Sequence, residues 1–547
     1  MAARSTGLEK LAMRNRGIIA VKTHAAAIIL ALALPTNAHA ATAQTPRGKV
    51  WWADIEAIAS DANAGRLPGS PGFDRAAAFV TKRFRAMGLR PAGADGGFAQ
   101  PVALQSQTID HAASTGALIA ADGSRAVLAM GRDLVVGPGG GPAPSLVDAP
   151  LVFIGYGLKL PGHDDISGVD LQGKIAVVIS GGPADLPGPM KAANRAARVG
   201  FLRDAGAVGL ISLVTPAQVE IPWDRRMLLA GQSGMYLDDP GARGAPDGFF
   251  TGAFDPAQSE RLFARSGRRF ADIAALADAS APVPGFDLAQ RLTASVVSAR
   301  APVASYNLVA RLDGGHPKLR SEYVVVSAHL DHLGVGSSTN GDAIYNGAMD
   351  DASGVASVLG IADRLRKGAR PKRSVLFVVV TAEEKGLLGS RYFARNPVVP
   401  KAAIVANLNL DMPLPFWPLR LVLVQGDGES SLGATARRIA AVQGLALTPD
   451  PLPERNSFTR TDQFSFVEAG IPALAFKFGF VKNSPEFAIE RDWRANRYHA
   501  PSDDVAQPGV LADEAVRLDA FIAGIARSVA NSPARPTWLD TSVFKPR

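Results

Sequence analysis

The sequence contains no cysteine in its 547 residues. This absence excludes disulfide bonds, thiolate metal sites, cysteine nucleophiles and a lipid anchor attached through cysteine. Any metal site must therefore be built from histidine and carboxylate side chains, which supply nitrogen and oxygen ligands. The chain has only eight histidines, so the pool of nitrogen ligands is small.

Long apolar runs are also scarce. The run from Ala25 to Leu34 is about ten residues long, too short for a helix that spans a bilayer. Five basic residues and one acid precede the run, and Ala-His-Ala follows at residues 38–40. This order predicts a secretory signal cleaved after Ala40, with a second possible cleavage site at residues 41–43. We therefore expect a periplasmic or secreted protein without a stable membrane anchor.

The chain carries little net charge for its length. The formal net charge is +8, and it falls to +4 without residues 1–40, because five basic residues and one acid go with them. No basic stretch with interleaved aromatic residues accompanies this excess, so a nucleic-acid partner is not expected. The sequence leaves the oligomeric state open.

Three regions differ in their sequence pattern. Residues 41–148 show helical periodicity over 74–88, preceded by a turn-rich loop at 65–72. Residues 149–297 change to short apolar strands separated by glycine, and residues 298–547 alternate longer apolar strands with helices. We interpret the first and third regions as two parts of one domain and the middle region as an insertion. Such an insertion requires the chain to enter and leave at neighbouring points.

The insertion is predicted to be rich in strands. Its apolar runs indicate strands at 151–157, 174–179 and 208–214, and its periodicity indicates a helix at 192–204. A further helix is expected from Asp255, because this capping residue is followed by proline at the first helical position.

The third region predicts a mixed, mainly parallel sheet covered by helices on both faces. Apolar, β-branched runs flanked by helical segments are typical of parallel strands buried in an α/β domain. Sites in such sheets form at the carboxyl ends of the strands, where loops converge on one crevice. The predicted strands are 323–328, 374–381, 402–410, 419–425 and 473–476.

Six polar residues form the candidate site, and three of these strands end in them. Two imidazoles and three carboxylates are the ligands that a pair of zinc ions needs, with one carboxylate bridging the ions. The extra glutamate beside a ligand is placed to act as a general base. The six residues are His329, Asp350, Glu383, Glu384, Asp411 and His499.

Three neighbouring residues need a separate interpretation. Asp331, two residues after His329, is a candidate for orienting that imidazole and raising its basicity. His332 has no partner in the pattern, and we interpret it as structural. Asp351 competes with Asp350 as a ligand, although an aspartate at a helix start is ordinarily a cap.

These motifs resemble the family of co-catalytic zinc peptidases that contains bacterial leucyl aminopeptidases, aminopeptidase Y and glutamate carboxypeptidase. The resemblance covers nearly the whole mature chain, and it implies a zinc-exopeptidase, phosphorylase/hydrolase-like fold with an inserted protease-associated domain. It further implies two zinc ions per chain. One would be bound by His329 and Asp411 and the other by Glu384 and His499, with Asp350 as the bridge and Glu383 as the base.

The resemblance also bears on details around the bridge. The bridging aspartate of the family stands three residues before the serine of a Ser-Gly pair, here Ser353, which selects Asp350 over Asp351. The peptide bond after the bridging aspartate is expected to be cis. Two residues depart from the family pattern: Met349 replaces a polar residue, and Gln463 stands where many members have histidine.

The favoured interpretation is an exported zinc aminopeptidase that removes N-terminal residues from peptides through a hydroxide bridging the metals. Tyr498 is a candidate for binding the substrate oxyanion, and simple packing is its alternative role. A dipeptidase or carboxypeptidase on the same site is the second interpretation, in which Arg460 either receives a substrate carboxylate or forms a structural salt bridge. A glutaminyl cyclase and a non-catalytic, receptor-like protein are further alternatives.

Overall fold

The computed structural model of the chain describes residues 44–546, apart from residues 138 and 456. The predicted signal segment lies outside the described residues. Within the part of the chain that the structure describes, no helix combines the length and apolar character needed to cross a membrane.

The third region forms the predicted sheet. Strands β20, β17, β13 and β16 are parallel neighbours in that order, and β12 (Gly285–Leu312) follows β16 in the antiparallel sense. The sequence pattern predicts a parallel strand at 419–425, but β18 runs antiparallel to β20. A strand covered on both faces shows the same apolar run in either direction, so the pattern does not reveal this difference. The bounds are β13 (Tyr323–His329), β16 (Ser374–Val380), β17 (Ile404–Leu410), β18 (Leu421–Gln425), β19 (Ala446–Thr448) and β20 (Ala473–Phe478).

Helices cover both faces of this sheet, as predicted. Val324 and Val326 of β13 pack with helices α1, α7 and α12, whereas Val325 packs with α8 and α10 on the opposite face. This alternation follows from the two-residue period of a strand. All three valines are 0% exposed, so the strand lies in the core of a three-layer α/β sandwich. The helices are α1 (Pro46–Ile58), α7 (Ser353–Lys367), α8 (Leu388–Arg395), α10 (Gln463–Glu468) and α12 (Ala512–Asn531).

The predicted first helix is α2 (Pro71–Ala86). Ser70 caps its first turn by accepting a hydrogen bond from the N–H of Phe73 at 3.2 Å. Gly88, with a φ of 69°, follows its C-terminus. A glycine takes this left-handed conformation without a steric penalty, which is why the helical pattern ends there.

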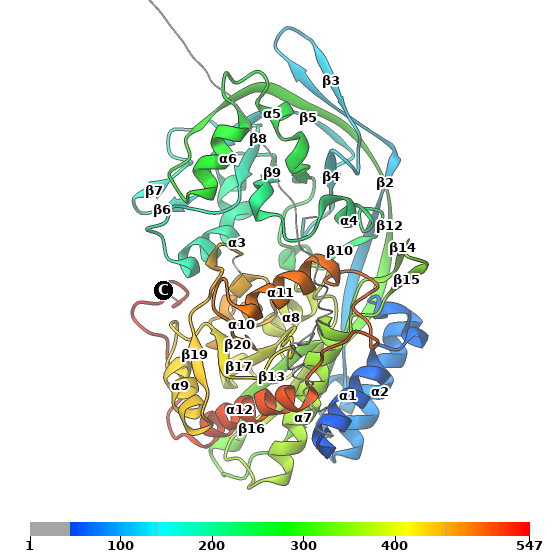
Figure 1. Cartoon of the computed structure of the whole chain (residues 1–547), viewed down its shortest axis with the longest axis vertical. Coiled ribbons are helices and arrows are strands. Elements are labelled where there is room, and N and C mark those ends of the chain that lie inside the picture. Colours follow the sequence, from blue (N-terminus) through cyan, green and yellow to red (C-terminus); the bar gives the residue numbers. More distant parts are fainter. Residues whose placement is uncertain (1–43, 138, 456, 547) are drawn as a thin grey trace, which may run out of the picture. The chain divides into compact units, whose positions relative to one another are not determined.

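Two long antiparallel strands connect the helix-covered sheet to the region predicted as an insertion. β2 (Ala99–Ala120) and β12 (Gly285–Leu312) run side by side (Figure 1) and pair along most of their length. β12 also pairs with β16 at one end and with β5 (Leu146–Ile154) at the other. The sequence pattern does not predict these strands, because polar residues interrupt their apolar positions. The chain enters and leaves the insertion side by side, with Ala149 opposite Leu292, and the division at 149–297 remains a prediction.

The insertion contains the three strands predicted for it. β5, β8, β9 and β11 are successive parallel neighbours, and α3 corresponds to the predicted helix at 192–204. The helix predicted from Asp255 is only a 3-10 turn followed by the short α5 (Glu260–Phe263). The backbone turns at Gly267, whose φ is 72°, before the longer α6 (Phe270–Asp278) begins. The other bounds are β8 (Ile175–Ile179), β9 (Gly209–Leu213), β11 (Phe250–Phe254) and α3 (Gly188–Asp204).

A buried carboxylic acid in the helical layer leads to a prediction about stability. Asp519 of α12 is 1% exposed, and burial raises its pKa from 3.8 to about 8, although Ser357 and Arg364 act in the opposite direction. Between these two pH values the folded state keeps the proton that the unfolded chain releases, so stability falls as the pH rises. We expect Asp519→Asn to raise the free energy of unfolding, relative to the unmodified protein, more at pH 8 than at pH 5.

Urea unfolding of both proteins at the two pH values measures this difference. Asp363→Asn is a matched control on α7, because Asp363 pairs with Lys367 at 2.9 Å near the surface. An Asp519→Asn effect of the same size at both pH values would show that the carboxyl group is not protonated in the folded state.

Candidate metal centre

The six predicted site residues converge at the carboxyl edge of the sheet. β13 ends at His329, the glutamate pair follows β16, and Asp411 follows β17 directly. Because β16, β13 and β17 are neighbouring parallel strands, these three ends meet. Asp350 comes from the turn before α7, and His499 comes from the loop after α11 (Pro485–Asn496).

Asp350 lies at the centre of the site, with one carboxylate oxygen directed at each of two histidines. Its Oδ1 is 3.2 Å from Nε2 of His329, and its Oδ2 is 3.3 Å from Nε2 of His499. Asp411 supplies a donor atom within 4.8 Å of those of His329 and Asp350. On the other side, Oε2 of Glu384 is 3.2 Å from Nε2 of His499. The two donor groups thus share Asp350, as the sequence resemblance implies for two metals.

The adjacent Asp351 is occupied by backbone donors. Its Oδ1 accepts from the N–H of Gly354 at 2.9 Å and of Met412 at 3.1 Å, and its Oδ2 accepts from the N–H of His329 at 3.3 Å. Asp351 therefore ties the ends of β13 and β17 to the start of α7, whereas both Asp350 oxygens face side chains. The peptide bond between the two aspartates is cis, as expected from the resemblance.

Asp503, which no sequence pattern indicates, holds the backbone that carries Asp350. Its carboxylate accepts from the N–H of Met349 at 2.9 Å, from the N–H of Asp350 at 3.0 Å and from Nε2 of Gln507 at 2.8 Å. Asp503 thereby fixes the turn without occupying the Asp350 side chain. The Met349 side chain is completely buried in the core, which accounts for an apolar residue at this position.

Arg66 is a completely buried cation that joins two ligand-bearing loops. Its guanidinium donates to the carbonyls of Leu330 at 2.7 Å, of Gly347 at 3.0 Å and of Asn346. Burial lowers the pKa of Arg66 to about 10, with Asp331 and other nearby carboxylates acting in the opposite direction. Arg66 therefore stays charged at neutral pH and offsets part of the negative charge of the site. No sequence pattern distinguishes it from other loop arginines.

Asp331 supports the glutamate pair through its carboxylate and His329 through its carbonyl. Its Oδ1 and Oδ2 accept from the N–H groups of Glu383 and Glu384 at 3.0 and 3.3 Å. The Nδ1 of His329 lies 3.1 Å from the main-chain oxygen of Asp331 and 3.9 Å from its carboxylate. A carbonyl acceptor assigns the proton to Nδ1 and leaves Nε2 free to bind a metal. Asp331 thus orients the imidazole through its main chain instead of its side chain.

Glu383 and Glu384 point in different directions. Glu384 lies between two imidazoles, because its Oε1 is 2.7 Å from Nδ1 of His332 and its Oε2 faces His499. Glu383 instead approaches Nε2 of His329, at 3.9 Å. The Glu383 side chain is 11% exposed and that of Glu384 is 5% exposed. Glu384 has the position of a ligand, and Glu383 keeps contact with solvent.

His332 belongs to the site, although its sequence context suggests a structural role. The side chain is 0% exposed, and its donor atom lies within 4.8 Å of those of Asp350 and Glu384. Neither imidazole nitrogen has a hydrogen-bond partner among the described residues, since the close approach to Glu384 lacks hydrogen-bond geometry. His332 lies in the loop after β13, where no strand or helix periodicity predicts the direction of a side chain.

The side chains of the site carry more negative than positive charge. Burial, joined by neighbouring carboxylates, raises the pKa of Asp331 to about 6 and that of Asp462 to about 7. Burial acts on Glu384 in the same direction, but His499 and His332 outweigh it and lower the pKa of Glu384 to about 2. Additional positive charge would therefore stabilise the ionised form of the remaining carboxyl groups.

Several donor atoms of the site have no hydrogen-bond partner among the described residues. They include Nε2 of His329, Oδ1 of Asp411 and Oε1 of Glu384. Buried polar atoms without partners are rare in proteins, and imidazole nitrogens and carboxylate oxygens are zinc ligands. The donor set and its charge thus fit divalent metal ions.

Tyr498 connects the metal centre with a group of arginines. Its ring centroid is 3.9 Å from that of His499, and the Arg494 guanidinium lies 4.9 Å from the Tyr498 ring. Burial raises the pKa of Tyr498, with Asp350 acting in the same direction and Arg460 against it. The phenol therefore keeps its proton at neutral pH and can donate a hydrogen bond.

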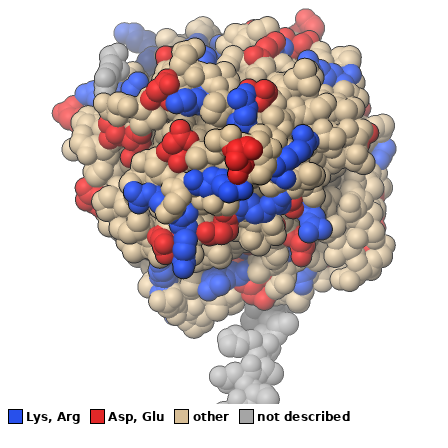
Figure 2. Space-filling view, turned by 90° about the horizontal axis from the view of Figure 1, so that it is seen from above, with Lys and Arg blue, Asp and Glu red and all other residues tan. Residues whose placement is uncertain are grey.

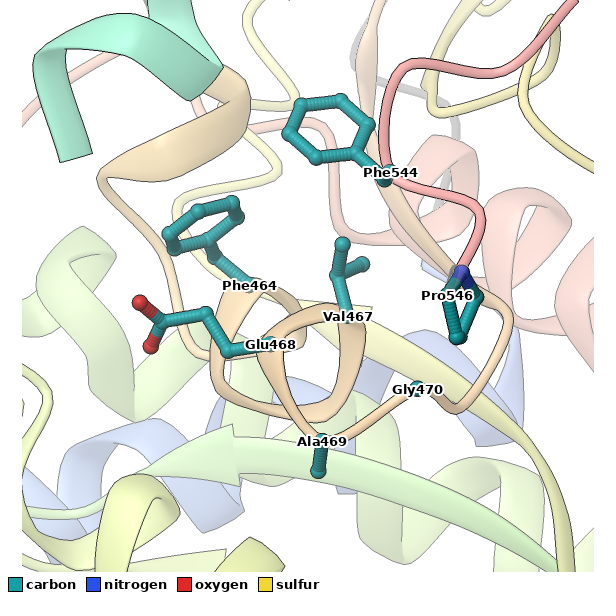
Figure 3. A pocket seen from close by; sticks show the side chains of 7 residues that line it. All are labelled: Phe464, Val467, Glu468, Ala469, Gly470, Phe544 and Pro546. Carbon is teal, nitrogen blue, oxygen red and sulfur yellow. The ribbon is translucent and has the colours of Figure 1, made fainter. Parts of the chain in front are cut away.

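Two cavities lie near these elements. The larger, of about 470 Å³, is lined by α10 and the C-terminal segment, including Phe464 and Phe544, and by none of the six site residues (Figure 3). The smaller, of about 40 Å³, is lined by Met412, which directly follows Asp411, and by Trp417. None of the six site residues lines the smaller cavity either, although Asp411 directly precedes its wall in the chain.

The third region of the chain matches a known peptidase family. The family model described as Peptidase family M28 matches residues 307–517, which include all six predicted site residues. Residues 307–517 are thus similar in sequence to the metallopeptidases of family M28, and the match confirms the predicted family resemblance. Residues 149–297, predicted as a protease-associated domain, lie outside the match.

Two proteins are similar in sequence to this chain over part of their length. Leupeptin-inactivating enzyme 1 of Streptomyces exfoliatus is 32% identical over 169 residues, 30% of this chain and 34% of that protein. Probable leucine aminopeptidase 2 of Aspergillus fumigatus is 29% identical over 214 residues, 36% of this chain and 40% of that protein. The chain thus spans between 34% and 40% of the length of these relatives.

A solved aminopeptidase from Aneurinibacillus sp. strain AM-1 is similar in fold. It has a TM-score of 0.51 and 19% sequence identity, and the likeness covers 91% of this chain and 96% of the other. At this identity the likeness shows the fold alone, and it confirms the mixed α/β architecture.

The position of His332 leads to a prediction about metal affinity. Because Nδ1 of His332 is 2.7 Å from Oε1 of Glu384, we expect His332→Ala to weaken zinc binding at the site containing Glu384. Loss of a group that supports a ligand typically lowers metal affinity about 10- to 100-fold. Titration of the metal-free protein with zinc against a competing chelator measures this affinity.

His163→Ala is the matched control, because His163 pairs with Asp185 at 3.0 Å in the insertion. Unchanged zinc affinity in His332→Ala would restore the structural interpretation of His332.

Proposed function

We propose that this protein is an exported aminopeptidase that binds two zinc ions per chain and removes N-terminal residues from peptides. The observation that carries the proposal is the position of Asp350 between His329 and His499, with one oxygen near each imidazole. A carboxylate placed in this way suits a bridge between two metal ions. The family M28 match over residues 307–517 and the name of the Aspergillus relative support the peptidase class.

In the proposed arrangement, each zinc ion has its own pair of ligands and shares Asp350. When bound, zinc supplies a Lewis acid that polarises the scissile carbonyl and makes water more acidic. The carboxylates of Asp351, Asp331 and Asp503 accept hydrogen bonds from backbone N–H groups of the ligand-bearing segments and so orient the ligands. The pairs are His329 with Asp411 and Glu384 with His499.

Glu383 is the proposed general base, and it is distinguished from Glu384 by what surrounds it. Its carboxylate lies beside the metal ligands but keeps solvent contact, whereas that of Glu384 is enclosed by His332 and His499. Burial raises the pKa of Glu383, which favours uptake and return of a proton near neutral pH. In this role Glu383 takes a proton from the attacking water and passes it to the leaving amine. Tyr498 is proposed to donate to the oxyanion.

The proposal also covers the role of the insertion and the export of the protein. We propose that residues 149–297 form a separate domain that restricts access to the site and supplies no metal ligand. Among the described residues of this region, none belongs to the two groups of potential ligands. Arg225 of the insertion donates to the carbonyls of Arg494 at 2.7 Å and Tyr498 at 2.9 Å, next to His499. Export rests on the predicted signal segment with cleavage after Ala40.

The dipeptidase or carboxypeptidase alternative has one observation in its favour, the two arginines Arg460 and Arg494 near Tyr498. The two functions differ in whether the free N-terminus of a peptide is required. N-acetylation should abolish turnover by an aminopeptidase and leave turnover by a carboxypeptidase intact.

The division of roles between the two glutamates generates a test of the mechanism. We expect Glu383→Gln to keep both zinc equivalents and to lower kcat about 10²- to 10⁴-fold, the usual contribution of general acid–base catalysis. Glu384→Gln should instead lower zinc affinity, because it changes a ligand. Elemental analysis and turnover of a leucyl peptide measure the two effects. Equal zinc loss in both variants would overturn the assignment.

A further inference from the structure

The loop that carries His499 follows the end of helix α11. The helix ends at Asn496, and His499 comes three residues later. The backbone of His499 has a φ of 55°, a left-handed conformation that is unfavourable for residues with a side chain. Such a conformation persists only where surrounding contacts enforce it. The contacts of this loop therefore determine where the imidazole lies.

The last four carbonyl groups of α11 belong to residues 493–496 and need partners beyond the helix. The first and the last of them accept hydrogen bonds from the loop itself. Trp493 accepts from the N–H of Arg497 at 2.7 Å, and Asn496 accepts from the hydroxyl of Ser502 at 2.8 Å. The two carbonyls between them accept from a residue of the insertion.

This residue is Arg225 of helix α4 (Trp223–Met227). Its guanidinium donates to the carbonyl of Arg494 at 2.7 Å and to that of Ala495. The same guanidinium donates at 2.9 Å to the carbonyl of Tyr498, the residue before His499. One side chain of the insertion thus closes the end of α11 and holds the backbone next to the imidazole.

A guanidinium suits this position for two reasons. Its N–H groups have a fixed geometry, so one side chain reaches several carbonyls at once. Its positive charge also lies at the C-terminus of a helix, where the aligned peptide dipoles leave partial negative charge. Arg225 is therefore a stronger cap for α11 than a neutral side chain would be.

Helix α4 is itself fixed to the part of the chain that lies outside the loop. Nε1 of Trp223 donates to the carbonyl of Arg132 at 2.8 Å. A ring nitrogen of His111, on β2, lies 2.8 Å from the carbonyl of Ala230, shortly after α4. The guanidinium of Arg225 therefore extends from an anchored segment, and the loop of His499 is held against it.

Other arginines of the insertion pair with carboxylates close to them in the sequence. Arg203 of α3 lies 2.7 Å from Asp204, and Arg243 contacts Asp247. On the face shown in Figure 2, basic and acidic side chains are intermingled. Exposed ion pairs contribute little to stability. Arg225 instead binds backbone atoms 270 residues further along the chain, so its contacts join two distant segments.

We propose that Arg225 is a positioning residue for the metal ligand His499. Nε2 of His499 lies 3.2 Å from Oε2 of Glu384 and 3.3 Å from Oδ2 of Asp350, so a small shift of the loop changes both approaches. The insertion then supplies no ligand but completes the zinc site of Glu384 and His499. This inference rests on the proposed two-zinc function and adds a role in metal binding to the insertion.

The other zinc site provides an internal reference. His329 ends β13 and Asp411 follows β17, so the sheet places both residues. Loss of the Arg225 contacts should therefore weaken zinc binding at one site and leave the other unchanged. This asymmetry distinguishes a positioning role from a general loss of structure.

Zinc titration of the metal-free protein against a competing chelator tests the inference. Arg225→Met removes the hydrogen bonds and the charge, and we expect it to lower zinc affinity at one of the two sites about 10- to 100-fold. Arg225→Lys keeps the charge and part of the donors, so it should retain part of the affinity. Arg203→Met is the matched control in the insertion and should bind both zinc ions like the unmodified protein.

A double substitution identifies the weakened site. Glu384→Gln removes a ligand of the site that contains His499, so its effect and that of Arg225→Met act on the same zinc ion. Effects on one site are coupled. The combined variant should therefore lose less affinity than the product of the two separate factors, and full multiplication of the factors would overturn the assignment to this site.

Turnover of a leucyl peptide gives a second readout. Because Arg225 binds backbone atoms of the protein, Arg225→Met should leave the KM of the peptide unchanged. Its kcat should fall at limiting zinc and recover at zinc concentrations about 10- to 100-fold higher, in line with the expected loss of affinity. A raised KM with an unchanged kcat would indicate a loss of substrate binding and would overturn the positioning role.

The outcomes separate this inference from the proposed function. Unchanged zinc affinity in Arg225→Met, or an equal loss at both sites, would overturn the positioning role and leave the two-zinc proposal intact. A single zinc equivalent in the unmodified protein would contradict the two-zinc proposal. Hydrogen exchange of the metal-free protein would then decide the positioning role. Arg225→Met should speed exchange of the hydrogen-bonded amides of Arg497, Tyr498 and Ala500, and unchanged exchange would overturn the inference.

Discussion

The concentration of carboxylates at one edge of the sheet is the constraint around which the rest of the site is organised. Charged groups removed from water are costly unless they are paired or hydrogen-bonded. Three kinds of partner offset this cost: backbone N–H donors, the buried Arg66 and the imidazoles. The carboxylates are Asp331, Asp350, Asp351, Glu383, Glu384, Asp411, Asp462 and Asp503.

Five of these carboxylates divide into two classes according to their partners. Asp331, Asp351 and Asp503 accept from backbone N–H groups, so they stabilise the loops and fix their geometry. Asp350 and Glu384 instead face imidazoles. This difference explains how two adjacent aspartates of the same chemistry acquire different roles. A metal centre positioned in this way depends on backbone held by buried side chains, which resist small displacements.

The sequence predicted the ligand candidates better than the residues that support them. His329 and Asp411 were found because each ends a buried apolar strand, and parallel strand ends meet at one edge of a sheet. Arg66 and Asp503 form hydrogen bonds with backbone atoms far away in the sequence, and no local sequence pattern predicts such contacts. The same applies to His332, whose position depends on the path of a loop. The long strands β2 and β12 were not predicted because polar residues break their apolar pattern. The strand β18 was predicted, but in the wrong direction, because buried strands look alike in both directions.

The central claim is that Asp350 is shared by two metal ions. Anomalous diffraction from crystals of the zinc-loaded protein, recorded above and below the zinc absorption edge, tests this claim most directly. The account predicts two zinc peaks, one between Asp350 and His329 and the other between Asp350 and His499. A single peak, or two peaks that do not share Asp350, would contradict it.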